Sequence, residues 1–207
     1  MDQAIADVLA IYDARMADDM RKMKAARDGQ ASFDEVRDQV LLAVGPETGR
    51  LINILARGMT APTILELGTS YGYSGIWLAE AARASGGRLI TMEKADYKAN
   101  YAREMSVKAG LADHVDFRVG DAVQMIRDLP HGVDFVLVDL WKDLYVPCLE
   151  AFYPKLNPGA VIVADNMRQP DPVEAAKYQA AVRAMPKMTS IPVPVGSGLE
   201  ISRFDAA

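Results

Sequence analysis

Acidic side chains that follow apolar, strand-like runs are the residues of this sequence best suited to chemistry. Five such runs, rich in Val, Ile and Leu, end at or near an acid: Glu66, Glu93, Asp121, Asp139 and Asp165. In an open parallel sheet the carboxyl ends of the strands meet at one edge, and ligands bind there. We therefore expect these carboxylates to line one site that suits a cationic ligand or a metal ion.

Two of these acids predict a metal site. If the strands that end at Asp139 and Asp165 are neighbours, their carboxylates lie about 4.8 Å apart and repel by about 3 kcal/mol at an effective dielectric constant of about 20. A hard divalent cation such as magnesium, held by both carboxylates and the Asn166 carbonyl, would relieve this repulsion. Water and a shared proton are the alternative.

A glycine-containing turn, ELGTSYGYS at residues 66–74, joins the first of these strands to a helix and lets a ligand approach the backbone. Glu93 ends the next strand, where a carboxylate can accept both hydroxyls of a ribose; the alternative is an exposed loop acid. Asp121 could accept from an adenine amino group or only cap the helix that follows it.

The elements that must position these residues alternate along the chain. Strands are predicted at residues 63–68, 88–93, 115–121, 133–140 and 160–167, and helices at 73–85, 95–110, 122–129, 145–156 and 172–185. This alternation predicts a Rossmann-like, doubly wound α/β fold with a parallel sheet covered by helices on both faces. A last hairpin, with Gly-Ser-Gly at 196–198, places a final antiparallel strand beside the others.

Length and composition indicate one domain over residues 1–207, with a helical extension at 1–50 and the ligand-binding core at 51–207. We expect the extension to lie over the mouth of the sheet or against a second subunit, with one break at ARDGQASFDE (26–35) and another at GPETGR (45–50). No apolar run approaches the about 20 residues of a membrane span, and an acidic N-terminus predicts a cytoplasmic protein. A net charge of −5 argues against a nucleic-acid partner. The single cysteine, Cys148, is predicted to pack in the core.

ELGTSYGYS, ITMEK, VGDA, VDLWKDLY and VADNM occur in this order and spacing. With these motifs the sequence resembles the cation-dependent class I S-adenosylmethionine O-methyltransferases, of the catechol and caffeoyl-CoA type, over roughly residues 40–204. The resemblance implies a seven-stranded sheet of order 3-2-1-4-5-7-6 with strand 7 antiparallel. It also implies a homodimer.

The resemblance assigns roles to individual residues. The methionine end of the cofactor would be surrounded by Glu66, Gly68, Thr69 and Ser74. The ribose would lie at Glu93, and the adenine at Asp121 and Ala122. Asp139, Asp165 and Asn166 would bind the metal, with Asp139 also near the sulfonium. Lys142 would be the catalytic base and contact the substrate with Asn166. Trp141 would wall the adenine side of the pocket, although a core aromatic is an equal alternative.

Glu200 in GLEIS is placed at the carboxyl edge by the predicted hairpin. In catechol methyltransferases a glutamate in a similar setting binds the substrate hydroxyl that is not methylated, so the resemblance implies substrate binding. An edge-strand acid that deters aggregation is the alternative. Two departures, Leu140 in place of a histidine and Lys94 in place of an apolar residue, affect adenine packing rather than chemistry.

These features predict methyl transfer from S-adenosylmethionine to a small phenol with vicinal hydroxyls, with Mg²⁺ or another divalent cation bound. A nearby cation should lower the pKa of Lys142, so that its neutral amine can take the substrate proton. The alternatives are a caffeoyl-CoA-like thioester or a hydroxylated tRNA base as acceptor, an NAD-dependent oxidoreductase, and a non-catalytic cofactor-binding protein.

Overall fold

This computed structural model describes residues 2–29, 32–169 and 171–205. Within these ranges the strands form a seven-stranded sheet of order β3-β2-β1-β4-β5-β7-β6. The strands are β1 (Thr63–Leu67), β2 (Arg88–Glu93), β3 (Val115–Val119), β4 (Val133–Val138), β5 (Leu156–Ala164), β6 (Met188–Val193) and β7 (Leu199–Phe204). Neighbours from β3 to β5 pair parallel, whereas β7 is antiparallel to both β5 and β6. The predicted order and the hairpin are confirmed.

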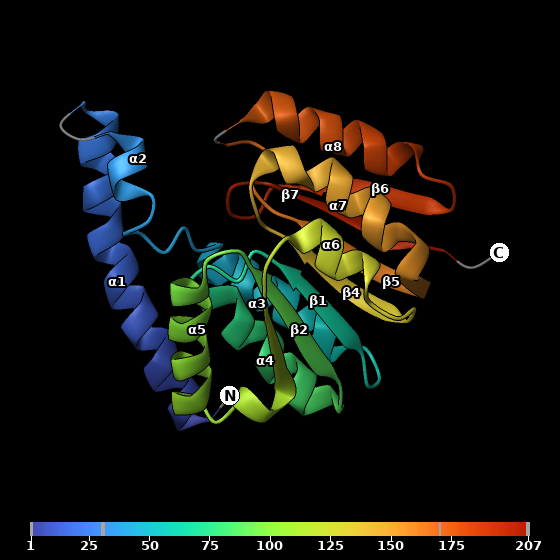
Figure 1. Cartoon of the computed structure of the whole chain (residues 1–207), viewed down its shortest axis with the longest axis horizontal. Helices are drawn as coiled ribbons and strands as arrows, with labels where there is room; N and C mark the ends of the chain where they lie inside the picture. The colour runs from blue at the N-terminus through green and yellow to red at the C-terminus, as the bar shows by residue number, and fades with distance from the viewer. Residues whose placement is uncertain (1, 30–31, 170, 206–207) are drawn as a thin grey trace.

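Helices cover both faces of this sheet (Figure 1). They are α1 (Gln3–Arg27), α2 (Phe33–Val36), α3 (Gly45–Arg57), α4 (Tyr73–Ser85), α5 (Asp96–Lys108), α6 (Ala122–Arg127), α7 (Tyr145–Phe152) and α8 (Pro172–Ala184). Strand alternation explains the two layers, because successive side chains point to opposite faces. In β4, Phe135 and Leu137 pack in the cluster with α3 and α4, and Val136 and Val138 pack in the cluster with α7 and α8.

Several predicted boundaries differ from the structure, and two of them change how the chain is divided. GPETGR is the first turn of α3 rather than a break, because Pro46 lies where a helix needs no backbone N–H donor. The predicted boundary between extension and core, at residue 50, therefore falls inside a helix. The fifth strand begins at Leu156, before the Pro158 and Gly159 pair that resembles a turn, and it ends at Ala164 rather than at 167.

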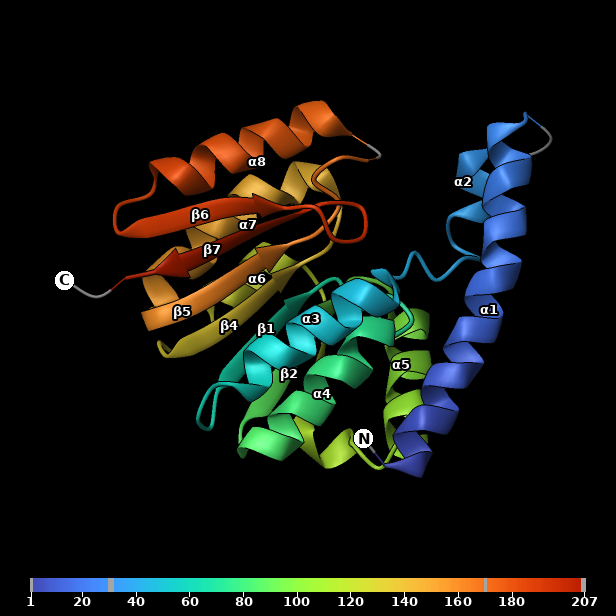
Figure 2. The same ribbon diagram turned by 180° about the vertical axis from the view of Figure 1, so that it is seen from behind.

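The N-terminal helix α1 packs against α4 and α5, and α2 packs against α1 (Figure 2). Ile5, Val8, Leu9 and Tyr12 are buried at helical spacing along α1. The following segment, residues 38–44, reaches the glycine turn, because the Ser70 hydroxyl donates to a backbone carbonyl in it, that of residue 41, at 3.0 Å. Among the described residues, no helix is both long enough and apolar enough to cross a membrane.

Candidate active site at the carboxyl edge of the sheet

Asp139 and Asp165 stand side by side just beyond the ends of β4 and β5. The register pairs Val138 with Ala164, and each aspartate is the next residue of its strand. Asn166 then adopts φ +61°, a left-handed conformation that turns the chain out of the sheet. Its Nδ2 donates to Asp139 Oδ1 at 2.8 Å. The three predicted metal-binding residues are thus brought together.

The electrostatics of this pair disfavour two ionised carboxylates, so a shared proton or a bound cation would stabilise it. Burial, and then the neighbouring Asp165 charge, raise the pKa of Asp139 well above its usual range. Burial likewise raises the pKa of Asp165 to about 6. Asp165 is 1% exposed, and its Oδ1 has no hydrogen-bond partner among the described residues. In the described part of the chain no three His, Cys, Asp or Glu side chains cluster as a metal site, so a cation here needs the Asn166 oxygen or exogenous oxygens as well.

Lys142 lies beside these acids because a short 3₁₀ helix, Lys142–Leu144, follows β4. Its Nζ donates to the backbone carbonyl of Asp165 at 2.9 Å. It also lies 3.6 Å from the ring centroid of Tyr145, whose hydroxyl donates to the same carbonyl at 3.1 Å. Burial lowers the pKa of Lys142 to about 8, against the opposing effects of Asp139 and Asp165. The amine is therefore poised to exchange a proton near neutral pH.

The glycine turn between β1 and α4 packs directly against the end of β4. Gly68 has φ +98°, and a Cβ there would lie 1.9 Å from the Asp139 carbonyl oxygen. Only glycine fits this position without displacing the backbone. The amides of Gly68 and Thr69 both donate to the Met92 carbonyl, at 3.0 and 3.1 Å. The turn is thereby fixed between the first, second and fourth strands.

Glu66 is a fully buried carboxylate behind this turn. Burial raises its pKa to about 7, although hydrogen bonds from Ser74 and Thr91 act in the opposite direction. The Thr91 hydroxyl donates to Glu66 Oε2 and shares a second hydrogen bond with the Thr69 hydroxyl. The other carboxylate oxygen of Glu66, Oε1, has no hydrogen-bond partner within the described residues. Glu66, Thr69 and Ser74 are thus brought together, as predicted for one end of the cofactor site.

In this structure the carboxylates of Glu93 and Asp121 both accept hydrogen bonds from backbone amides. Glu93 Oε2 accepts from the Ser70 amide at 2.8 Å, and its Oε1 accepts from the amides of residues 94 and 95, at 2.9 and 3.0 Å. Asp121 Oδ1 accepts from the Gln124 amide at 2.9 Å, which is the predicted cap of α6, and Ala122 begins that helix. The ribose and adenine roles of these residues stay predictions.

Trp141 is not a core aromatic, since it is 50% exposed. The Arg37 guanidinium carbon lies 5.7 Å from its ring centroid, which joins the end of β4 to the segment after α2. This distance is within the range of a cation–π contact. Its predicted place beside adenine stays a prediction.

Glu200 lies in β7 opposite Ala164, with its side chain directed to the α8 face of the sheet. Its carboxylate accepts from Arg183 at 2.8 and 2.9 Å, from Gln179 at 2.9 Å, and from Ser190. The edge-strand alternative is wrong, because β7 lies between β5 and β6. A substrate role for Glu200 stays a prediction, and it requires the carboxylate to release some of these donors.

Three contributors to the site were not predicted. Tyr145 follows Lys142 by one helical turn, and Thr91 lies on β2 at the level of Glu66. Their spacing offered a weak signal, because tyrosine and threonine at such positions are common in any core. The residue 38–44 segment offered none, since its contact with Ser70 spans 29 residues of chain. Cys148 is buried as predicted, and burial raises its pKa to about 12.

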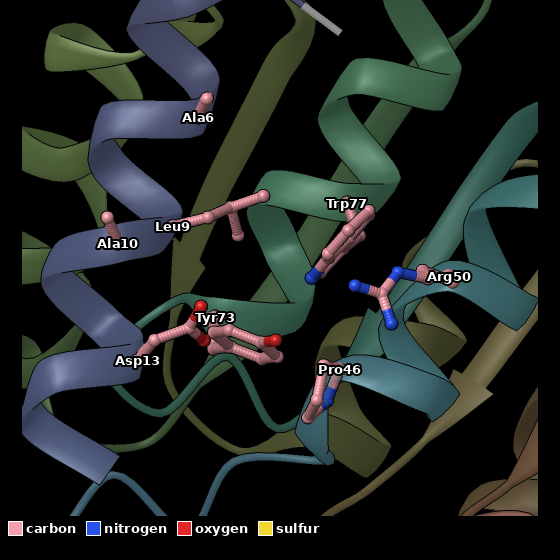
Figure 3. A pocket seen from close by; sticks show the side chains of 8 residues that line it. All are labelled: Ala6, Leu9, Ala10, Asp13, Pro46, Arg50, Tyr73 and Trp77. Atoms are coloured by element: carbon pink, nitrogen blue, oxygen red, sulfur yellow. The ribbon is translucent and has the colours of Figure 1, made fainter. Parts of the chain in front are cut away.

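A hollow of about 380 Å³ lies elsewhere, between α1, α3 and α4. Figure 3 shows Arg50 and the Trp77 indole on one side of it and Asp13 on the other. None of the site residues predicted from the sequence lines it. The chemistry assigned to the strand ends therefore does not depend on this hollow.

Comparisons with known proteins agree with this geometry. A family model described as O-methyltransferase matches residues 17–192. A catechol O-methyltransferase from Niastella koreensis is 35% identical over 130 residues, which are 61% of this chain and 58% of that protein, so this chain spans less than two thirds of that relative. A catechol O-methyltransferase from Mycobacterium tuberculosis is 33% identical over 78% of this chain and 71% of that protein. The crystal structure of an O-methyltransferase from Bacillus cereus in complex with SAH has a TM-score of 0.75 and 25% identity, covering 99% of this chain and 92% of that chain.

Proposed function

Because this chain belongs to the O-methyltransferase family, we propose that it methylates a small phenol with vicinal hydroxyls, using S-adenosylmethionine and a divalent cation. One observation carries the proposal. The carboxylates of Asp139 and Asp165 stand on adjoining strand ends, one buried oxygen lacks a partner among the described residues, and Lys142 lies beside them. The names of the two bacterial relatives support a catechol-like acceptor.

The cofactor would lie along the ends of β1, β2 and β4. Glu66, Gly68, Thr69 and Ser74 would surround its methionine end, and the buried Glu66 carboxylate offers a partner for a positive group there. Glu93 would hold the ribose, and Asp121 with Ala122 and Trp141 would lie at the adenine. When bound, S-adenosylmethionine supplies the methyl group. The SAH in the Bacillus cereus relative supports S-adenosylmethionine as the cofactor.

The donor set of Asp139, Asp165 and Asn166 suits a hard divalent cation such as Mg²⁺, since all its candidate ligand atoms are oxygens. In that role Asn166 would present its amide oxygen, whereas its Nδ2 now donates to Asp139. When bound, the cation supplies positive charge that favours the ionised form of a phenol. Both aspartates are then held in the charged form that burial alone disfavours.

Lys142 would take the proton of the reacting hydroxyl on Nζ. Its contacts with Tyr145 and the Asp165 carbonyl hold the amine at the edge of the site. Because burial already lowers its pKa to about 8, an appreciable fraction of the amine is neutral near pH 7.5. Asn166 and, if it exchanges donors, Glu200 would contact the second hydroxyl. Family membership favours methyl transfer over the oxidoreductase alternative.

The direct test is transfer of labelled methyl from S-adenosylmethionine to catechol, in Mg²⁺ and in EDTA, with a single-hydroxyl phenol as control. We expect transfer to catechol in Mg²⁺, at least 100-fold less in EDTA, and little transfer to the control. Full activity in EDTA would refute the metal role. Absence of transfer to any phenol would refute the acceptor class. The predicted homodimer is checked separately by light scattering.

A further inference from the structure

A second, smaller hollow of about 190 Å³ adjoins the strand ends that carry Asp165 and Asn166. Two hydrogen bonds place it there. The Met167 amide donates to the Gly198 carbonyl at 2.9 Å, and the Arg168 amide donates to the Ser197 carbonyl at 3.0 Å. Figure 2 shows the loop after β5 and the β6–β7 turn at the same end of the sheet. We call this hollow the Arg168 pocket.

The walls of the Arg168 pocket are mainly apolar. They come from the loop after β5, from the end of β6 and from the start of β7, and include Met167, Pro192, Val193, Pro194 and Leu199. Such walls suit an aromatic or short alkyl tail, with polar side chains fixing its direction. The two long polar side chains at the pocket are Arg168 and Gln179.

Arg168 is exposed, and its side-chain stem lies against Gly198 at this pocket. Gly198 adopts φ +86°, and a Cβ on it would lie 2.8 Å from Arg168 Cγ and 3.1 Å from Cδ. The aliphatic part of Arg168 thus lies across the bare glycine backbone. Because the stem is confined in this way, less rotamer freedom is lost when the guanidinium binds a ligand.

The guanidinium of Arg168 forms no ion pair with an acid among the described residues. Arg183, by contrast, forms an ion pair with Glu200, with 2.8 Å between Nε and Oε1. Glu200 also accepts from Gln179, so the acid next to the pocket is already satisfied by its own arginine. An arginine guanidinium beside an apolar hollow suits recognition of a planar anion.

On the basis of the proposed function, we infer that the Arg168 pocket binds the tail of the methyl acceptor and that this tail ends in a carboxylate. The acceptors are then dihydroxylated aromatic acids rather than neutral catechols. A volume of about 190 Å³ suits a ring substituent of a few atoms, whereas whole drug-sized ligands occupy about 300 to 1,000 Å³. A coenzyme A thioester therefore does not fit this pocket as a whole.

The experiment compares 3,4-dihydroxybenzoate, 3,4-dihydroxycinnamate, neutral catechol and caffeoyl-CoA as acceptors for the wild type and for Arg168→Gln, Arg168→Lys and Arg203→Gln. Arg203 is an exposed arginine on β7, ion-paired to Asp205, so its variant is a matched control for lost charge. We expect wild type to prefer an acid over catechol in kcat/KM. Arg168→Gln should reduce that preference roughly 10- to 100-fold through KM, Arg168→Lys should reduce it less, and Arg203→Gln should leave it unchanged.

Binding of 3,4-dihydroxybenzoate, measured by calorimetry with SAH and Mg²⁺ present, separates the two hypotheses. If no acceptor is methylated, the proposed function is wrong. Even then, weaker binding of 3,4-dihydroxybenzoate by Arg168→Gln, but not by Arg203→Gln, would support carboxylate binding in the Arg168 pocket. The inference would be overturned if wild type had the same kcat/KM for the acids and for catechol. It would also be overturned if Arg203→Gln reduced the preference for acids as much as Arg168→Gln does. A loss in Arg168→Gln that is confined to caffeoyl-CoA would overturn it too, because the anion would then be a phosphate.

Discussion

At the scale of single residues, the proposed role of a bound cation depends most directly on Asp165. It is buried, one oxygen lacks a donor within the described residues, and burial raises its pKa to about 6. The folded state therefore binds a proton at Asp165 more readily than the unfolded state does. Proton binding at Asp165 therefore adds to the free energy of unfolding. This contribution is complete below the unfolded pKa of about 3.9, and it is lost as pH rises through about 6.

Replacing Asp165 with Asn should therefore stabilise the metal-free protein. In EDTA at pH 7 we expect the free energy of unfolding to rise by about 1 to 3 kcal/mol, with a melting temperature that changes less than that of wild type between pH 5 and 7. Mg²⁺ should raise the melting temperature of wild type and affect the variant less. Thermal melts in EDTA and in Mg²⁺ measure both effects. A variant less stable than wild type in EDTA at pH 7 would contradict this account.

The second residue-scale prediction concerns Lys142, whose amine must be neutral to accept a proton. Because its pKa is lowered to about 8 before any cation binds, kcat in Mg²⁺ should rise with pH at or below about 8 and level off above it. A bound cation moves this rise to lower pH. Lys142→Ala should reduce kcat by roughly 10²- to 10⁴-fold and abolish the rise. The measurement is a pH profile of kcat, and the same rise in Lys142→Ala would remove Lys142 as the base.

At the scale of elements, the turn between β1 and α4 is fitted to the end of β4. Gly68→Ala would place a Cβ 1.9 Å from the Asp139 carbonyl oxygen at a positive φ. We expect a loss of about 2 to 5 kcal/mol from backbone strain and overpacking together. Gly86→Ala, also at positive φ but with nothing within 4 Å of its Cβ, should lose only about 1 to 2 kcal/mol. Urea unfolding compares the two, and equal losses would show that the contact with Asp139 does not matter.

At the scale of the whole molecule, α1 joins the helical layer to the glycine turn. The Tyr12 hydroxyl donates to the Tyr71 carbonyl at 2.6 Å, and Gly72 lies against that hydroxyl. The Arg15 guanidinium carbon lies 4.1 Å from the Tyr71 ring centroid. The N-terminal helix is thus part of the structure that shapes the proposed cofactor site.

Tyr12→Phe tests this link. The buried Tyr71 carbonyl would lose its donor, so we expect a loss of about 1 to 3 kcal/mol in stability and weaker binding of SAH, because the turn is less well fixed. Tyr97→Phe is the matched control, since Tyr97 is 50% exposed. Chemical denaturation and calorimetric titration with SAH report the two quantities. Unchanged SAH affinity in Tyr12→Phe would separate α1 from the cofactor site.

The sequence by itself determined which segments along the chain form strands and helices, and at which edge of the sheet the acids gather. Hydrophobic periodicity reports which face of each element is buried, and parallel strands bring their carboxyl ends together regardless of side-chain detail. The tertiary structure alone decided that Arg183 takes Glu200, that Glu93 holds the Ser70 amide, and that Tyr145 lies against Lys142. These contacts join different elements, or depend on how a turn closes, so they follow from packing in three dimensions rather than from any local pattern.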